Sequence, residues 1–153
     1  MTRDEIAYRL VYHGEAFDVG AVIVETIGRL PEEVAEFALE HCVFTSAGES
    51  VYGMVLPGRL GVDCYRGREP GNLGRAVEGD KWFVLLADPL PPEDAHSIVA
   101  HEIAHAWRRD DKLTAIGGAE VEVSACQLVR GWGFTGLGCD VDHATRWWAP
   151  EGK

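Results

Sequence analysis

The sequence predicts an α+β fold with N-terminal helices, a small mixed sheet of about three to five strands, and two further helices. Three observations support it. Helix-start signals precede residue 42, and short β-branched and aromatic runs follow between Gly, Pro and Ser. A helical pattern then returns over residues 93–130. The length of 153 residues suits a single domain that spans residues 1–153.

The N-terminal part carries two clear helix signals and one ambiguous segment. Thr2-Arg-Asp-Glu5 fits a capping box that opens a helix ending near Gly14. Residues 16–29 fit either element, because their β-branched run favours a strand whereas a short apolar stripe allows a helix. Pro31 and the two glutamates after it suit the first turn of a helix that ends near His41.

The middle of the chain has the pattern of short strands separated by turns. The expected strands are Cys42–Thr45, Ser50–Leu56, Leu60–Tyr65 and Lys81–Ala87. Residues 67–80 are expected to form a loop because they are rich in glycine and charge. The strand before Asp88-Pro89 has the clearest pattern, since its short apolar run ends at that turn signal.

Two helices are expected in the last third of the chain. Pro91 and Pro92 suit the entry to the first, which runs from about Glu93 to Arg109. A linker with two glycines leads to the second, from about Ala119 to Arg130. Residues 134–153 carry no pattern that assigns them to an element.

Composition excludes several classes of function. Fourteen basic and 25 acidic residues give a net charge of −11, which disfavours direct binding of nucleic acid or of an anionic membrane. No apolar run is long enough to span a bilayer, and no basic-then-apolar leader is present, so a cytoplasmic location is expected. The cysteines (Cys42, Cys64, Cys126 and Cys139) are scattered, so we expect reduced and mostly buried thiols.

The motif that carries chemistry is His101-Glu102-Ile103-Ala104-His105, which has the form H-E-x-x-H within an expected helix. Residues four apart differ by about 40° around a helix, so both imidazoles point the same way. Two convergent neutral imidazoles are good zinc ligands. Glu102 can reach a water at the metal without being a ligand itself, which makes it the candidate general base.

A zinc enzyme needs a third protein ligand, and the following helix offers Glu120 and Glu122. The two lie about 200° apart around the helix, so at most one can face the metal. Glu122 borders the apolar face, where a carboxylate needs a compensating partner such as a metal ion. Glu122 is therefore the preferred ligand, with Glu120 as the alternative.

These residues resemble the gluzincins, metallopeptidases that add a glutamate from a following helix to H-E-x-x-H. More narrowly, they resemble the minimal cytoplasmic relatives of the ImmA/IrrE type. The second helix of that type reads E-x-x-A-(N/D)-x-(F/L)-A, a frame that Glu122-Val-Ser-Ala125-Cys126-Gln-Leu128-Val129 follows. Cys126 departs from it, because the family has there an Asn or Asp that helps to orient a metal-site histidine. The likeness covers residues 82 to about 134.

The resemblance implies a zincin-like fold with one zinc ion per chain. It implies His101, His105 and Glu122 as the zinc ligands and Glu102 as the catalytic acid/base. The implied activity is zinc-dependent hydrolysis of peptide bonds, in a specific protein substrate that an edge strand of the sheet binds by strand addition. Candidates for the donor that stabilises the oxyanion are His143, Tyr65, His96 and Arg146.

Two other interpretations remain open at this point. A catalytically silent zincin-fold module would keep the metal for regulation or for interaction with a partner. A decayed enzyme would be expected to lose Glu102 first, because the fold does not need it, so its presence favours the enzyme. An α+β protein with an accidental motif would hold no stoichiometric zinc.

Overall fold

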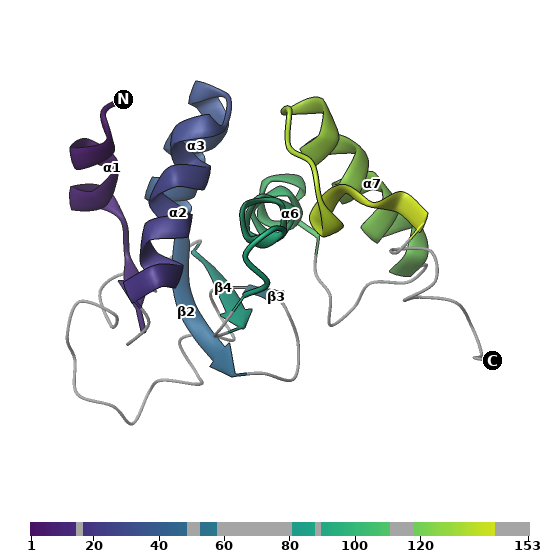
Figure 1. The fold of residues 1–153 in the computed structure, drawn as a ribbon, viewed down its shortest axis with the longest axis horizontal. Helices are drawn as coiled ribbons and strands as arrows, with labels where there is room; N and C mark the ends of the chain where they lie inside the picture. The colour runs from purple at the N-terminus through teal and green to yellow at the C-terminus, as the bar shows by residue number, and fades with distance from the viewer. Residues whose placement is uncertain (15–16, 49–52, 58–80, 88–89, 111–117, 143–153) are drawn as a thin grey trace.

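The computed structural model describes residues 1–14, 17–48, 53–57, 81–87, 90–110 and 118–142. Its helices are α1 (Arg3–Arg9), α2 (Phe17–Arg29), α3 (Glu32–His41), α6 (Ala95–Arg108), α7 (Gly118–Gly131) and the 3-10 turn η1 (Leu137–Cys139). Its strands are β1 (Tyr12–His13), β2 (Cys42–Gly48), β3 (Gly53–Pro57) and β4 (Trp82–Ala87). The predicted mixed α+β class is confirmed, with helices before and after the main strands of the described residues (Figure 1). The expected strand Leu60–Tyr65 and the loop over residues 67–80 lie outside the described residues.

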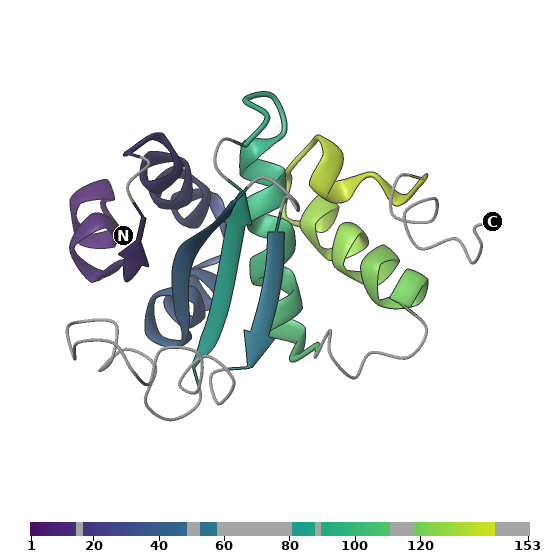
Figure 2. The ribbon, with the colours of Figure 1, turned by 90° about the horizontal axis from the view of Figure 1, so that it is seen from below.

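The strands form one mixed sheet in the order β1-β2-β4-β3. β1, β2 and β4 run parallel, whereas β3 pairs antiparallel with β4 at the edge of the described sheet. Figure 2 looks onto this sheet, with α3 and α6 passing behind it. Buried side chains from that face of β2 and β4, such as Phe44 and Val84, join those of the helices in one apolar core.

The first helix begins as predicted but ends earlier. Both bonds of the capping box form, with Thr2 N donating to Glu5 Oε2 over 2.6 Å and Glu5 N donating to Thr2 Oγ1 over 3.2 Å. The expected end near Gly14 is wrong, because Leu10 turns to extended backbone. The chain then enters β1 and pairs in parallel with β2, a long-range contact that the local pattern does not contain.

The ambiguous segment is helical, so its interpretation as a strand is wrong. Val19, Ile23 and Ile27 recur every fourth residue along α2 and are at most 4% exposed. They pack into the common core. Burial of this stripe outweighs the modest preference of β-branched residues for strands.

α6 occupies the centre of the molecule, between α2 on one side and α7 on the other (Figure 1). It also contacts β3, β4 and η1. Its residues Val99, Ala100, Ile103, Ala104 and Ala106 are all 0% exposed. A polar side chain on such a helix must find its partners inside the protein, since burying a polar group without one is unfavourable.

Two further expectations concern cysteines and membranes. Cys42, Cys126 and Cys139 are buried free thiols, as predicted, while Cys64 lies outside the described residues. Burial raises the pKa of the Cys42 thiol to about 12, so it stays protonated. Among the described residues, no helix has both the length and the apolar character needed to cross a bilayer.

Candidate metal centre

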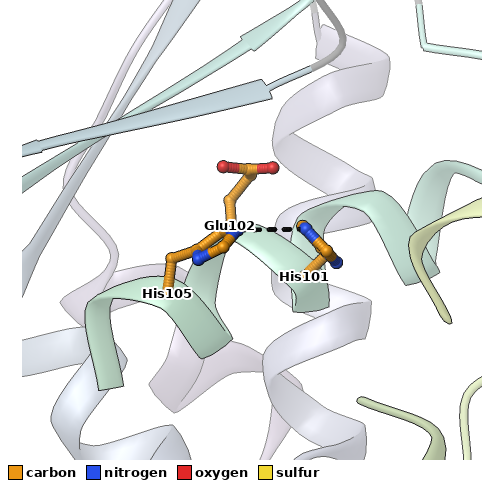
Figure 3. A group of neighbouring side chains, drawn as sticks. All are labelled: His101, Glu102 and His105. Atoms are coloured by element: carbon orange, nitrogen blue, oxygen red, sulfur yellow. Dashed lines mark hydrogen bonds between the residues drawn. The ribbon is translucent and has the colours of Figure 1, made fainter. Parts of the chain in front are cut away.

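Three ionisable side chains of α6 lie in the interior of the protein. His105 is 0% exposed, Glu102 is 4% exposed and His101 is 8% exposed. Figure 3 shows the two imidazole rings turned toward each other on one side of the helix, with the Glu102 carboxylate beside them. Ligand atoms of the three residues all lie within 4.8 Å of one another, so this buried group could hold a metal ion.

Glu122 of α7 reaches the same point from the neighbouring helix. Its two carboxylate oxygens lie 2.6 Å from His105 Nε2 and 3.5 Å from His101 Nε2. The two Nε2 atoms are themselves 3.0 Å apart. Glu120, the alternative from the sequence, has an exposed side chain. The structure therefore brings together His101, His105 and Glu122 and leaves Glu120 outside the cluster.

The outer nitrogen of His105 faces a carboxylate. Its Nδ1 lies 3.0 Å from Asp110 Oδ2, and Arg108 Nε lies 3.6 Å from the same oxygen. The bond depends on how α6 ends. Arg109 adopts the left-handed conformation with φ of 61°, and the next amide, Asp110 N, donates back to His105 O over 2.9 Å. This reversal of the chain places the Asp110 carboxylate beside the His105 ring.

The outer nitrogen of His101 faces a backbone carbonyl from the end of the described chain. Its Nδ1 lies 2.7 Å from Gly138 O in η1. Cys126 lies farther away, with its Sγ 3.7 Å from the same nitrogen. The shorter contact of His101 Nδ1 is thus with the main chain.

These contacts fix which ring nitrogens carry protons. A carbonyl only accepts, so His101 Nδ1 donates to Gly138 O, and by the same logic His105 Nδ1 donates to the Asp110 carboxylate. In the neutral rings both Nε2 lone pairs then face each other and Glu122. Lone pairs and a carboxylate at such short range repel unless a cation lies among them. The donor set therefore fits a bound metal ion.

The electrostatics of His101 indicate the same preference for positive charge. Burial acts to lower the pKa of His101, but hydrogen bonds to Cys126 and Glu122 act to raise it. The nearby negative charges of the two glutamates act in the same direction, and the result is a pKa of about 10. In the metal-free protein a proton on His101 supplies this positive charge, and a bound metal ion would replace that proton.

The candidates for the oxyanion donor are not part of this cluster. His96 lies against α2, where its Nε2 is 3.5 Å from Glu25 Oε2. Tyr65, His143 and Arg146 lie outside the described residues. No donor is therefore assigned among the described side chains.

Sequence reasoning missed Asp110 and Gly138, the two partners of the outer nitrogens. The helical pattern ends near Arg109, so Asp110 falls in the linker after the helix, and the left-handed turn at Arg109 brings it into contact with His105. An acidic residue directly after a metal-binding helix is a usable signal for such a partner. Gly138 is 37 residues from His101 and acts through its backbone, so no side-chain pattern marks it.

Comparisons of the chain with family models, with curated proteins and with solved structures found no match. The functional interpretation accordingly rests on the chain's own residues and on the geometry of this cluster.

Proposed function

We propose that this chain is a zinc-dependent metallopeptidase with a zincin-like fold that cleaves a specific protein substrate. The observation that carries the proposal is the convergence of His101, His105 and Glu122 from two packed helices, beside the carboxylate of Glu102. This is the arrangement that the resemblance to the gluzincins and the ImmA/IrrE type implies.

The spacing of the ligand atoms suits one zinc ion. Ligand atoms about 2.0–2.1 Å from a tetrahedral ion lie ~3.3 Å from one another. The corresponding separations among His101 Nε2, His105 Nε2 and the Glu122 oxygens are 2.6, 3.0 and 3.5 Å. Three protein ligands leave a fourth position open, as catalytic zinc sites require.

Two carboxylates compete for the role of third ligand. Glu122 contacts both imidazoles directly, and its side chain is 12% exposed. Glu102 belongs to the buried group whose ligand atoms all lie within 4.8 Å of one another. Glu122 fits a ligand and Glu102 fits a base, since a base must reach the reacting water rather than the ion.

The chemistry divides between the metal and Glu102. Zinc, when bound, supplies a Lewis acid that polarises a peptide carbonyl and lowers the pKa of water. Glu102 accepts the proton of the attacking water and passes it to the leaving amine. His105 and His101 stay oriented throughout, because Asp110 and Gly138 hold their outer nitrogens.

The sheet offers an edge suited to an extended substrate. Among the described strands, β3 is the outer one beyond β4, and α6 packs against it. An extended peptide can add to such an edge through main-chain hydrogen bonds. This supports a peptide as the substrate class, as the resemblance implies.

Cleavage of a random-sequence peptide library, followed by mass spectrometry, tests the activity. We expect zinc-loaded wild type to cleave, and Glu102→Gln to bind zinc equally but to cleave roughly 10²- to 10⁴-fold more slowly, because it lacks the general base. Equal cleavage by both proteins would contradict the role of Glu102. Stoichiometric zinc without cleavage by wild type would support a catalytically silent metal-binding module.

A further inference from the structure

We propose that residues 136–140, named here the η1 turn, act as a positioning element that orients the metal ligand His101 through the Gly138 carbonyl. The inference rests on the metal centre of the proposed function. It adds that the support for this ligand is a backbone group, which is held in place by Ser97 of α6 and by Asp94 at its N-cap.

The η1 turn is bound directly to the first turn of α6. Gly138 N donates to Ser97 Oγ over 2.9 Å, and Leu137 N donates to Asp94 Oδ1 over 2.9 Å. Asp94 stands at the N-cap of α6 but makes no side-chain cap bond to its own helix. Its carboxylate instead accepts from the turn. These two bonds fix the position of the Gly138 carbonyl along the axis of α6. The Ser97 anchor lies one helical turn before His101.

The turn can lie this close to α6 only because residue 138 is a glycine. A Cβ there would lie 1.9 Å from Ser97 O and 2.8 Å from Ile98 N, which are backbone atoms of the helix. Gly136 has φ of +121°, and a Cβ on it would lie 2.8 Å from Ser97 Oγ. Gly138 therefore lets the backbone of the turn pack directly on the backbone of α6, and Gly136 lets the turn approach the side chains of Ser97 and Asp94.

The other side of the turn is bound to α7. Arg130 donates from its guanidinium to Cys139 O over 2.8 Å. The turn thus joins the helix that carries His101 to the helix that carries Glu122. The Gly138 carbonyl lies between these anchors. Its orientation therefore depends on the distance between α6 and α7.

The neighbouring thiol is a poor substitute for this carbonyl. Cys126 Sγ is a weak acceptor and lies 3.7 Å from His101 Nδ1, against 2.7 Å for Gly138 O. The proposal therefore assigns the orientation of His101 to the turn and not to the side chain at position 126.

The test uses variants that loosen the turn without placing a side chain in the backbone contact. Ser97→Ala and Asp94→Ala each remove one anchor, and Asp94→Asn restores an acceptor for Leu137 N. Ser124→Ala, on α7, is the matched control for loss of a serine hydroxyl. Zinc affinity is measured by competition with a chelator. NMR follows the exchangeable ring proton on His101 Nδ1 in the metal-free protein, and His101→Ala assigns the signal.

We expect Ser97→Ala and Asp94→Ala to bind zinc about 10-fold or more weakly, and their His101 ring proton to exchange faster with water. Asp94→Asn and Ser124→Ala should retain the wild-type affinity and exchange rate. Wild-type values in both alanine variants would overturn the inference while leaving the metal centre in place. If wild type binds no zinc, the proposed function fails. The NMR signal of the His101 ring proton then still tests the inference. A protected signal in wild type that the alanine variants lose would support the positioning role of the turn. Absence of this signal from wild type would refute that role.

Discussion

At the scale of single residues, the histidines and the glutamate of the cluster could be predicted, whereas the partners of the outer ring nitrogens could not. The spacing of His101 and His105 is a local property of a helix, and Glu122 could be chosen because it borders an apolar face. Asp110 depends on a left-handed residue, Arg109, that no turn signal announces. Gly138 depends on a contact across 37 residues. Local periodicity carries no information about either.

Asp110 yields the first prediction. Asp110→Ala should weaken zinc binding about 10- to 100-fold, because His105 loses the acceptor that orients its ring. Competition with a chelator measures the effect. Asp4→Ala, an exposed carboxylate on α1, controls for the loss of one negative charge. Unchanged affinity in Asp110→Ala would contradict the role of this carboxylate.

At the scale of elements, the long periodic segments were the predictable ones. α3, α6 and α7 form close to their expected bounds, and β4 forms at the clearest apolar run. β1 is only two residues long and exists through pairing with β2, so its own sequence does not specify it. The helical state of α2 was decided by burial in the core, which outweighed the strand preference of Val and Ile.

Ion pairs of Arg9 join α1 to α3, and the shorter of the two, with Glu36, gives an element-scale prediction. Arg9 donates to both carboxylate oxygens of Glu36, over 3.0 and 2.6 Å. The hydrogen bond from Arg9 lowers the pKa of Glu36 below its ordinary value of 4.5. The pair therefore stabilises the fold above that pH, and this contribution is lost as the pH falls through the lowered pKa.

Chemical denaturation of wild type and Glu36→Gln at pH 7 and pH 3 measures the contribution of this ion pair to the free energy of unfolding. We expect wild type to be modestly more stable at pH 7 and the difference to shrink at pH 3. Glu33→Gln, an exposed change on the same helix, serves as the control for charge. A difference that grows on acidification would have the wrong sign and would contradict the assignment.

At the scale of the whole molecule, the cluster joins the central helix α6 to its neighbour α7. His101 and His105 come from α6, Glu122 comes from α7, and the η1 turn bridges both. The order of the sheet and the packing of η1 could not be predicted, because both are decided by long-range contacts. A metal bound at this junction would add to the packing and the hydrogen bonds that already join these parts of the chain.

Metal binding should therefore stabilise the fold. Free zinc at about 100 times the dissociation constant should add about 2.7 kcal/mol to the free energy of unfolding, since the unfolded chain does not present the site. Thermal unfolding with zinc and with excess chelator measures the shift. His101→Ala should show no such shift, and an equal shift in that variant would mean that zinc binds elsewhere.

The most direct test of the central claim is elemental analysis of the purified protein beside three variants. The account predicts about one zinc ion per chain in wild type and in Glu120→Ala, and loss of zinc in His101→Ala and Glu122→Ala. Glu120→Ala is the matched control, because it removes an exposed glutamate two positions away on the same helix. A wild-type protein that carries no zinc and cannot be loaded with it would contradict the account.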